Sequence, residues 1–250
     1  MDKKLFIDKL RRKLKNNETS IGAWQQIGSS EISEILSSSN VDWVAIDMEH
    51  GCISNSNLPN LFRAIELNNK LPFVRIQEKS SKAVKDALEA GAAGLIIPMI
   101  ENKDELEDLI SLSNLPPNGR RGIGFCRANQ YGINFKNYIK NPFRPFIVPM
   151  IENIEGLRNI DAITKVFNVD AILIGPYDLS ASLNCCGEFH NSNFVKSVDI
   201  IKKTAKANNI ASGIHIIEPV KERISEEINK GHQLIAFSLD TVMLQTLMVN

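Results

Sequence analysis

Ionisable side chains stand at or just after the ends of several short apolar runs. Arg75 ends one run, Asp47 and His50 follow another, and Glu152 and Asp178 follow two more. Two protein carboxylates with several waters are a common way to hold Mg²⁺, which leaves positions open for a substrate. A 2-oxo acid would chelate such an ion through its carboxylate and keto oxygens. The ion would then stabilise the enolate that forms when a C3 proton is lost. The residues therefore predict a metal-assisted acid–base site.

Each side chain suits one part of that chemistry. Glu152 and Asp178 are the candidate metal ligands. The guanidinium of Arg75 keeps its charge at working pH and could hydrogen-bond a developing oxyanion. Imidazole titrates near neutrality, so His50 is the candidate acid–base group, with Asp47 close enough in sequence to orient it. Taken singly, carboxylates at strand ends are more often helix caps or surface ion-pair partners than metal ligands. An arginine that ends a buried strand is as often a structural ion-pair partner as a ligand.

These residues can form one site only if the fold brings the ends of their strands together. About eight uniformly apolar runs alternate with stretches of helical spacing such as Leu58, Leu61 and Ile65, and such runs suit parallel strands buried on both faces. We therefore expect one domain, residues 1–250, folded as a (β/α)8 TIM barrel with its site at the strand C-termini. A doubly wound open sheet is the competing architecture, but no GxGxxG string follows the first run. The expected strands are Ile21–Trp24, Trp43–Ile46, Phe73–Ile76, Gly94–Pro98, Phe146–Ile151, Ala171–Gly175, Ser212–Ile216 and Leu234–Leu239.

Local signals mark helix ends and one irregular segment. Ser30 is expected to cap the helix that begins at Glu31, and Gly91 to end the helix before it. Residues 115–145 hold four prolines, and a connection this long is usually functional or disordered. We expect residues 120–132 to shape specificity, with Arg127 meeting either a second carboxylate on the substrate or a neighbouring subunit.

Composition narrows the classes of partner. The 250 residues are 43% hydrophobic and 23% charged, and 29 basic residues balance 29 acidic ones. This balance argues for neither nucleic acid nor a membrane surface as partner. No apolar run approaches the ~18 residues of a membrane span, and none has signal-peptide length near the N-terminus. The four cysteines lack CxxC spacing, so we expect a cytoplasmic protein with reduced thiols.

Longer strings resemble the HpcH/HpaI family of class II pyruvate aldolases from about Ile21 to Leu244. The two most specific are the D-x-E-H string at Asp47–His50 and the G-P-x-D-L-S string at Gly175–Ser180. Supporting strings are Gly22–Trp24, Val74-Arg75, Val84–Ala92, Ile97–Met99, Arg121–Gly124 and Ile151-Glu152.

The resemblance implies a pyruvate-type barrel that cleaves a 4-hydroxy-2-oxo acid reversibly to pyruvate and an aldehyde through a metal-stabilised enolate. It implies Glu152 and Asp178 as ligands of Mg²⁺, Mn²⁺ or Co²⁺. It further implies Arg75 as the enolate-stabilising group and His50 as the base, with Asp47 as the partner of His50.

The resemblance also implies a substrate pocket and an assembly. Trp24 would pack near the substrate, and the backbone around Tyr177 and Asp178 would receive the pyruvate carboxylate. Family members are commonly hexamers, trimers of dimers that exchange a C-terminal helix, and the tail 242–249 is compatible with such an exchange or with ordinary packing.

The sequence departs from the family pattern at three positions. Met150 stands where a glutamine is common, and a thioether lacks the hydrogen bonds of an amide. Tyr177 replaces a small residue and would narrow the pocket or add a donor. His215 lacks an obvious equivalent, so it either lines the same mouth or is a buried, satisfied histidine.

Two other functions stay open at this point. An oxaloacetate-type decarboxylase would use the same metal and arginine without a base that removes a C3 proton. A non-catalytic binding barrel is the alternative from a different class.

Overall fold

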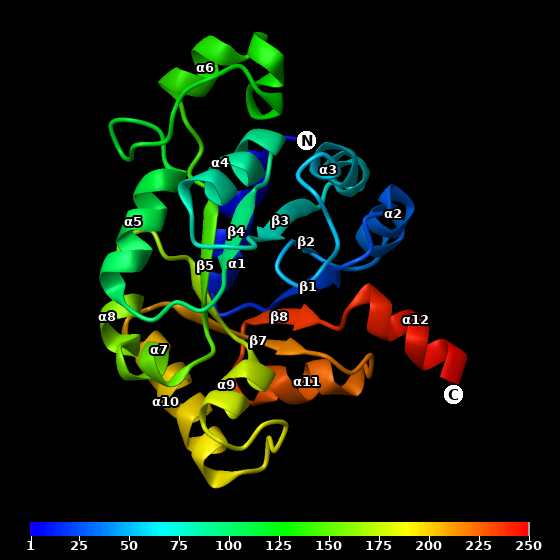
Figure 1. Cartoon of the computed structure of the whole chain (residues 1–250), viewed down its shortest axis with the longest axis vertical. Coiled ribbons are helices and arrows are strands. Elements are labelled where there is room, and N and C mark those ends of the chain that lie inside the picture. The colour runs from blue at the N-terminus through cyan, green and yellow to red at the C-terminus, as the bar shows by residue number, and fades with distance from the viewer. Residues whose placement is uncertain (250) are drawn as a thin grey trace.

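The computed structural model describes residues 1–249, and its centre is a closed barrel of parallel strands in chain order from β1 to β8 (Figure 1). The closed barrel confirms the predicted fold class and excludes the open sheet. Each expected strand is present, with its ends within two residues of the prediction. The strands are β1 Ser20–Gln25, β2 Trp43–Asp47, β3 Leu71–Arg75, β4 Gly94–Ile97, β5 Phe146–Ile151, β6 Ala171–Ile174, β7 Ala211–Ile216 and β8 Leu234–Phe237.

Helices cover the outside of the barrel (Figure 1). They are α1 Lys3–Lys15, α2 Ser30–Ser38, α3 Leu58–Leu67, α4 Ser81–Ala90, α5 Lys103–Ser113, η1 Arg127–Gly132, α6 Phe135–Lys140, α7 Ile154–Arg158, α8 Ile160–Thr164, α9 Pro176–Ser182, α10 Ser192–Ala207, α11 Glu222–Asn229 and α12 Asp240–Val249. The sequence patterns did not single out α1 or α10.

Alternation along each strand divides the apolar residues between two cores. Trp24, Phe73 and Met150 belong to the core inside the barrel, whereas Ile46 and Val74 belong to the core between the strands and the helices. A parallel strand sends every second side chain inward. Asp47 is paired with Arg75 in the register of β2 and β3, so both side chains belong to one inward-facing layer at the strand C-termini.

The first helix closes the opposite end of the barrel. Ile7, Leu10 and Leu14 of α1 are buried in the inner core, beside residues such as Leu71 and Phe146 at the starts of their strands. The inner core is therefore shut off from water at the N-terminal end, which leaves the C-terminal end as the open one.

The predicted cap at the end of α4 is confirmed, whereas the predicted cap at the start of α2 is off by one residue. Gly91 ends α4 in the left-handed region with φ of +107°, as predicted. Ser30 was predicted to cap α2, but the cap is Ser29, whose hydroxyl accepts a hydrogen bond from the N–H of Ile32. The backbone of Ser29 is extended, as a capping residue requires, while Ser30 is already helical.

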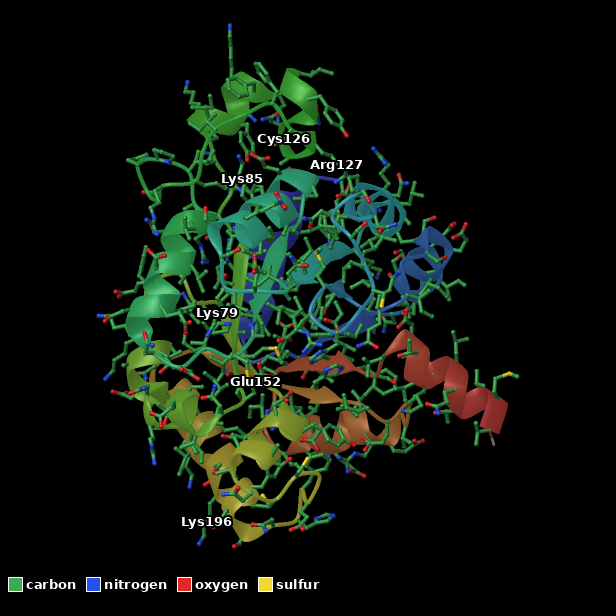
Figure 2. The ribbon with its side chains drawn as sticks, in the orientation of Figure 1. Lys79, Lys85, Cys126, Arg127, Glu152 and Lys196 are labelled. Atoms are coloured by element: carbon green, nitrogen blue, oxygen red, sulfur yellow. The ribbon has the colours of Figure 1, made fainter. Side chains whose placement is uncertain are left out.

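The irregular segment lies at the wrong end for the role predicted for it. It connects α5 to β5 and therefore lies beside the strand N-termini, and Figure 2 shows Arg127 and Cys126 far from Glu152. Arg127 donates to the carboxylate of Glu66 (2.7 and 3.2 Å) and to the carbonyl of Ala90 (3.0 Å). The prediction that residues 120–132 shape the site of their own barrel is wrong, because a segment between a helix and the next strand emerges opposite the mouth.

The last helix, α12, extends away from the barrel (Figure 1). Leu244, Leu247, Met248 and Val249 of α12 are all exposed. Within residues 1–249, no helix is both long and apolar enough to span a bilayer.

Candidate active site

A buried ion pair occupies the mouth of the barrel. Asp47 is fully buried and Arg75 is 5% exposed. Arg75 Nε donates to Asp47 Oδ1 (2.9 Å), and Nη2 donates to Oδ2 (2.6 Å). Such a two-pronged contact fixes the plane of the guanidinium. It also leaves other N–H groups of Arg75 free to point elsewhere.

Further donors surround the Asp47 carboxylate. Gln26 Nε2 donates to Oδ2 (2.9 Å), and the N–H groups of Glu49 and His50 donate to Oδ1 (3.1 and 3.2 Å). Burial alone would raise the pKa of Asp47, but the hydrogen bonds and charge of Arg75, with the other donors, lower it to about 2. Asp47 therefore stays ionised at working pH, and it holds Arg75 in place.

The structure corrects the predicted partnership between Asp47 and His50. Asp47 receives the backbone N–H of His50 and orients Arg75 instead of the imidazole. The ring of His50 is 59% exposed, and its Nε2 lies 4.0 Å from Glu49 Oε2. That same glutamate oxygen is 2.9 Å from Arg75 Nη1. Glu49 thus bridges the cation and the imidazole, a role that sequence reasoning missed although the D-x-E-H string contains the residue.

Glu152 is buried with one oxygen unsatisfied. The residue is 2% exposed; Met99 N–H donates to Oε1 (2.7 Å), whereas buried Oε2 has no hydrogen-bond partner among the described residues. Met99 reaches this position with φ of +52°, a conformation that such residues rarely adopt and that clusters at functional sites. Gly175 makes room for the carboxylate, since a Cβ there would lie 2.2 Å from Oε2.

The electrostatics around Glu152 call for a cation. The pKa of Glu152 is raised to about 7, mainly by burial, and the charges of Asp178 and Glu49 contribute to the rise. Burial likewise raises the pKa of Glu49, with Asp47 and Asp178 adding to the shift. Asp178 itself is exposed in the first turn of α9. A divalent cation would bring Glu152, Asp178 and Glu49 favourable charge, and Glu152 Oε2 a ligand.

The donor set also limits what the protein supplies to such an ion. Among residues 1–249, no group of three or more His, Cys, Asp or Glu side chains is close enough to hold a metal on its own. Two carboxylates fit the coordination of Mg²⁺ or Mn²⁺, which commonly keep water or substrate oxygens as their remaining ligands.

Trp24 and His215 form the floor under Arg75. The guanidinium carbon of Arg75 lies 5.1 Å from the centre of the Trp24 ring. The ring of His215 in turn packs against Trp24, with the two ring centres 4.4 Å apart. Trp24 is fully buried, and His215 is 7% exposed with its Nε2 3.2 Å from the Ser238 carbonyl oxygen. Both residues therefore support the cation from below.

The other two departures from the family pattern, Met150 and Tyr177, lie in different surroundings. Met150 is buried in the inner core, one layer below Glu152. Tyr177 is 44% exposed, and its ring packs edge-on against Phe189 with centres 5.1 Å apart. It lines a cavity of about 870 Å³ between α9, α10, β7 and α11. The phenol therefore borders a largely apolar recess beside the mouth.

Comparison with known proteins gives a consistent result. The sequence pattern of the HpcH/HpaI aldolase/citrate lyase family matches residues 20–245. A hydroxypyruvate/pyruvate aldolase of Roseobacter denitrificans is 29% identical over 95% of this chain and 93% of its own length. A 5-keto-4-deoxy-D-glucarate aldolase of Escherichia fergusonii is 28% identical over 98% and 96%. The crystal structure of a family protein from Burkholderia cenocepacia superposes with a TM-score of 0.90 at 27% identity, covering 96% of both chains.

The buried imidazole of His215 predicts acid sensitivity. Burial lowers its pKa from the ordinary 6.5 to about 4, so below pH 6.5 the unfolded chain binds more protons than the folded one. The free energy of unfolding should therefore fall by roughly 3 kcal/mol from this residue as pH drops from 6.5 to 4. Urea unfolding at pH 7.5 and 4.5 should show a smaller acid loss for His215→Gln than for the wild type. The exposed His190, replaced in the same way, should leave that loss unchanged; equal losses in all three proteins would contradict the assignment.

Proposed function

The chain belongs to the HpcH/HpaI aldolase/citrate lyase family, and we propose that it cleaves a 4-hydroxy-2-oxo acid reversibly to pyruvate and an aldehyde. Its curated relatives are aldolases, so the chain is an enzyme with lyase activity, and the alternative of a non-catalytic barrel is set aside. The proposal rests on one observation: the barrel mouth holds both a fixed cation, Arg75, and a cluster of carboxylates whose negative charge is only partly neutralised.

The fixed guanidinium of Arg75 is suited to stabilising an oxyanion. Cleavage breaks the C3–C4 bond of the substrate after the C4 hydroxyl loses its proton, and the bond electrons move to C2–C3 and the C2 oxygen. That oxygen gains negative charge only as the reaction proceeds. Arg75 has N–H groups that Asp47 and Glu49 do not use, and its orientation is set before substrate arrives, so it stabilises this charge without reorganisation.

A proton must leave the C4 hydroxyl and another must reach C3. His50 is the group proposed for this transfer, because its ring is exposed at the mouth beside Glu49. Glu49 Oε2 lies 4.0 Å from His50 Nε2, so the carboxylate faces the imidazole that would carry the proton between the two steps. Atoms balance when the proton taken from the hydroxyl, or one exchanged with water, ends on C3 of pyruvate.

The acidic cluster suits the divalent cation on which aldolases of this family depend. Glu152 and Asp178 would hold Mg²⁺, Mn²⁺ or Co²⁺, and such an ion supplies Lewis-acid polarisation of the oxo acid. Substrate oxygens would complete the positions that the two carboxylates leave open. The first turn of α9, which carries Tyr177 and Asp178, presents backbone N–H groups to the pyruvate carboxylate.

The aldolase proposal predicts a metal-dependent cleavage that needs Glu152. Retro-aldol cleavage of several 4-hydroxy-2-oxo acids, followed by coupled detection of pyruvate, should stop with a chelator and return with Mn²⁺. Glu152→Gln keeps the volume but removes the charge, and kcat should fall by roughly 100-fold or more. Glu155→Gln, an exposed matched control, should retain activity; full activity of Glu152→Gln would show that the metal ligands are assigned wrongly.

One observation keeps a decarboxylase in view. His50 is held only loosely, with Glu49 Oε2 at 4.0 Å as its nearest ion-pair partner, whereas Arg75 and Asp47 are rigidly placed. Decarboxylation of an oxaloacetate-type substrate needs the oxyanion-stabilising groups but no base at C3.

Replacing His50 with alanine should separate the two reactions. Aldol cleavage should drop by roughly 10²- to 10⁴-fold, the usual contribution of a general acid–base group, while decarboxylation should largely survive. Proton–deuterium exchange at the pyruvate methyl group, followed by NMR, provides a parallel measure of enolate formation. An aldolase whose cleavage and exchange rates are unaffected by His50→Ala would need another base.

We also propose that α12 docks on a second copy of the chain, within a homo-oligomer such as a hexamer. Four exposed residues of α12, Leu244, Leu247, Met248 and Val249, are apolar, and the main packing partner of the helix within the barrel is β1. Leaving several such side chains in water is unfavourable, and a second copy offers the same apolar surface in return.

The docking proposal predicts that a charge on α12 weakens assembly. Sedimentation should give the wild type several times the mass of one chain, and Leu247→Glu should shift the population to smaller species. Leu67→Glu places the same charge at a comparably exposed leucine on α3 and should leave the mass unchanged. A monomeric wild type at micromolar concentration would refute the proposal.

A further inference from the structure

A continuous set of hydrogen bonds connects the last helix to the buried ion pair. Thr241 Oγ1 donates to Gln26 Oε1 (3.1 Å), and Gln26 Nε2 donates to Asp47 Oδ2 (2.9 Å). That carboxylate oxygen is the one that also accepts from Arg75 Nη2 (2.6 Å). The start of α12 is thus three hydrogen bonds from the guanidinium.

The chemistry of each group fixes the direction of this relay. An ionised carboxylate only accepts, so the Gln26 atom that faces Asp47 must be the amide nitrogen. The amide oxygen then faces Thr241, whose hydroxyl can donate to it. Turning the amide over would lose the bond to Asp47, because an amide oxygen cannot donate to a carboxylate.

The backbone of Gln26 is held by the same turn of α12. Asp240 is 3% exposed, and its carboxylate accepts the N–H groups of Gln26 and Ile27, both at 2.9 Å. These bonds fasten the chain just after β1 to the beginning of α12. Asp240 therefore sets the position of the Gln26 backbone, and Thr241 holds the oxygen of the Gln26 amide at the end away from Asp47.

We propose that Gln26 is a positioning residue through which the first turn of α12 holds Asp47, and hence Arg75, in the geometry that the reaction needs. This inference rests on the proposed function for its kinetic consequence. The carboxylate of Asp47 has two oxygens to share among Arg75, Gln26 and two backbone donors. Loss of the Gln26 bond frees the carboxylate to rotate about its bond to Cβ, and the guanidinium paired with it must follow.

A matched pair of substitutions at Thr241 tests the relay. Thr241→Val has nearly the same shape but no hydroxyl, whereas Thr241→Ser keeps the hydroxyl. Loss of one such bond should lower kcat for cleavage by roughly threefold to tenfold with KM unchanged, because Arg75 acts on charge that develops during the reaction. Thr241→Ser should restore kcat to within about twofold of the wild type.

A double-mutant cycle shows whether Thr241 acts through Gln26. Gln26→Leu should slow cleavage at least as much as Thr241→Val, and the double variant should be no slower than Gln26→Leu alone. Purely structural damage would lower the unfolding midpoint and leave kcat per folded site unchanged. Wild-type kcat in Thr241→Val, additive losses in the double variant, or an equal loss in Thr241→Ser would each overturn the relay.

Crystal structures of the two Thr241 variants give a readout that does not need activity. In Thr241→Val the Gln26 amide should turn away from Asp47, and in Thr241→Ser it should stay. If the wild type neither cleaves hydroxy-oxo acids nor exchanges pyruvate protons, the proposed function fails while these structures still decide the relay. A Gln26 amide that keeps its bond to Asp47 in Thr241→Val would overturn the relay whatever the activity.

Discussion

A guanidinium inside the mouth of a barrel is tolerable only when carboxylates neutralise it and hydrogen-bond it, and the rest of this site is arranged around that requirement. An unpaired charge at the burial of Arg75 would cost several kcal/mol. Asp47 therefore has to lie beside it in the register, Glu49 has to approach from the loop, and Trp24 provides the face beneath. The constraint that makes Arg75 stable also fixes where its remaining N–H groups point, so structural and chemical demands coincide in one ion pair.

The opposite side of the mouth is left unbalanced. Glu152 is more buried than Arg75, yet its only described hydrogen bond comes from the N–H of Met99, and Asp178 and Glu49 add like charge. A fold selected only for stability would gain by replacing such a carboxylate or by pairing it. The contrast between a fully satisfied ion pair and an unsatisfied acidic cluster in one barrel mouth is what the proposed cleavage requires, because the ion pair must stay fixed while the cluster accepts ligands.

Sequence reasoning predicted the strands and the layer of site residues because both follow from period-two alternation and strand ends. It assigned Asp47 to the wrong partner, since neighbours along the chain are visible in a sequence whereas the register between β2 and β3, which places Asp47 opposite Arg75, is not. It gave residues 120–132 a role in specificity because they belong to a long, proline-containing connection, and such connections are often functional. Their position between a helix and the following strand instead places them at the opposite end of the barrel. Nothing in the sequence indicates that Gln26 faces Asp47 or that Glu152 Oε2 lacks a partner, because both depend on contacts between distant segments.

α12 combines two features: its first turn makes hydrogen bonds to the segment after β1, and its later residues expose apolar side chains. Its first residue accepts two N–H groups from the segment after β1, and its second orients Gln26 against Asp47. The residues beyond it carry apolar side chains that water covers poorly. A helix is stiff over this length, so whatever surface covers its end also restrains its first turn. Covering α12 would therefore stabilise the Gln26 contact, and in the proposed oligomer the geometry of the ion pair would depend on assembly as well as on the single barrel.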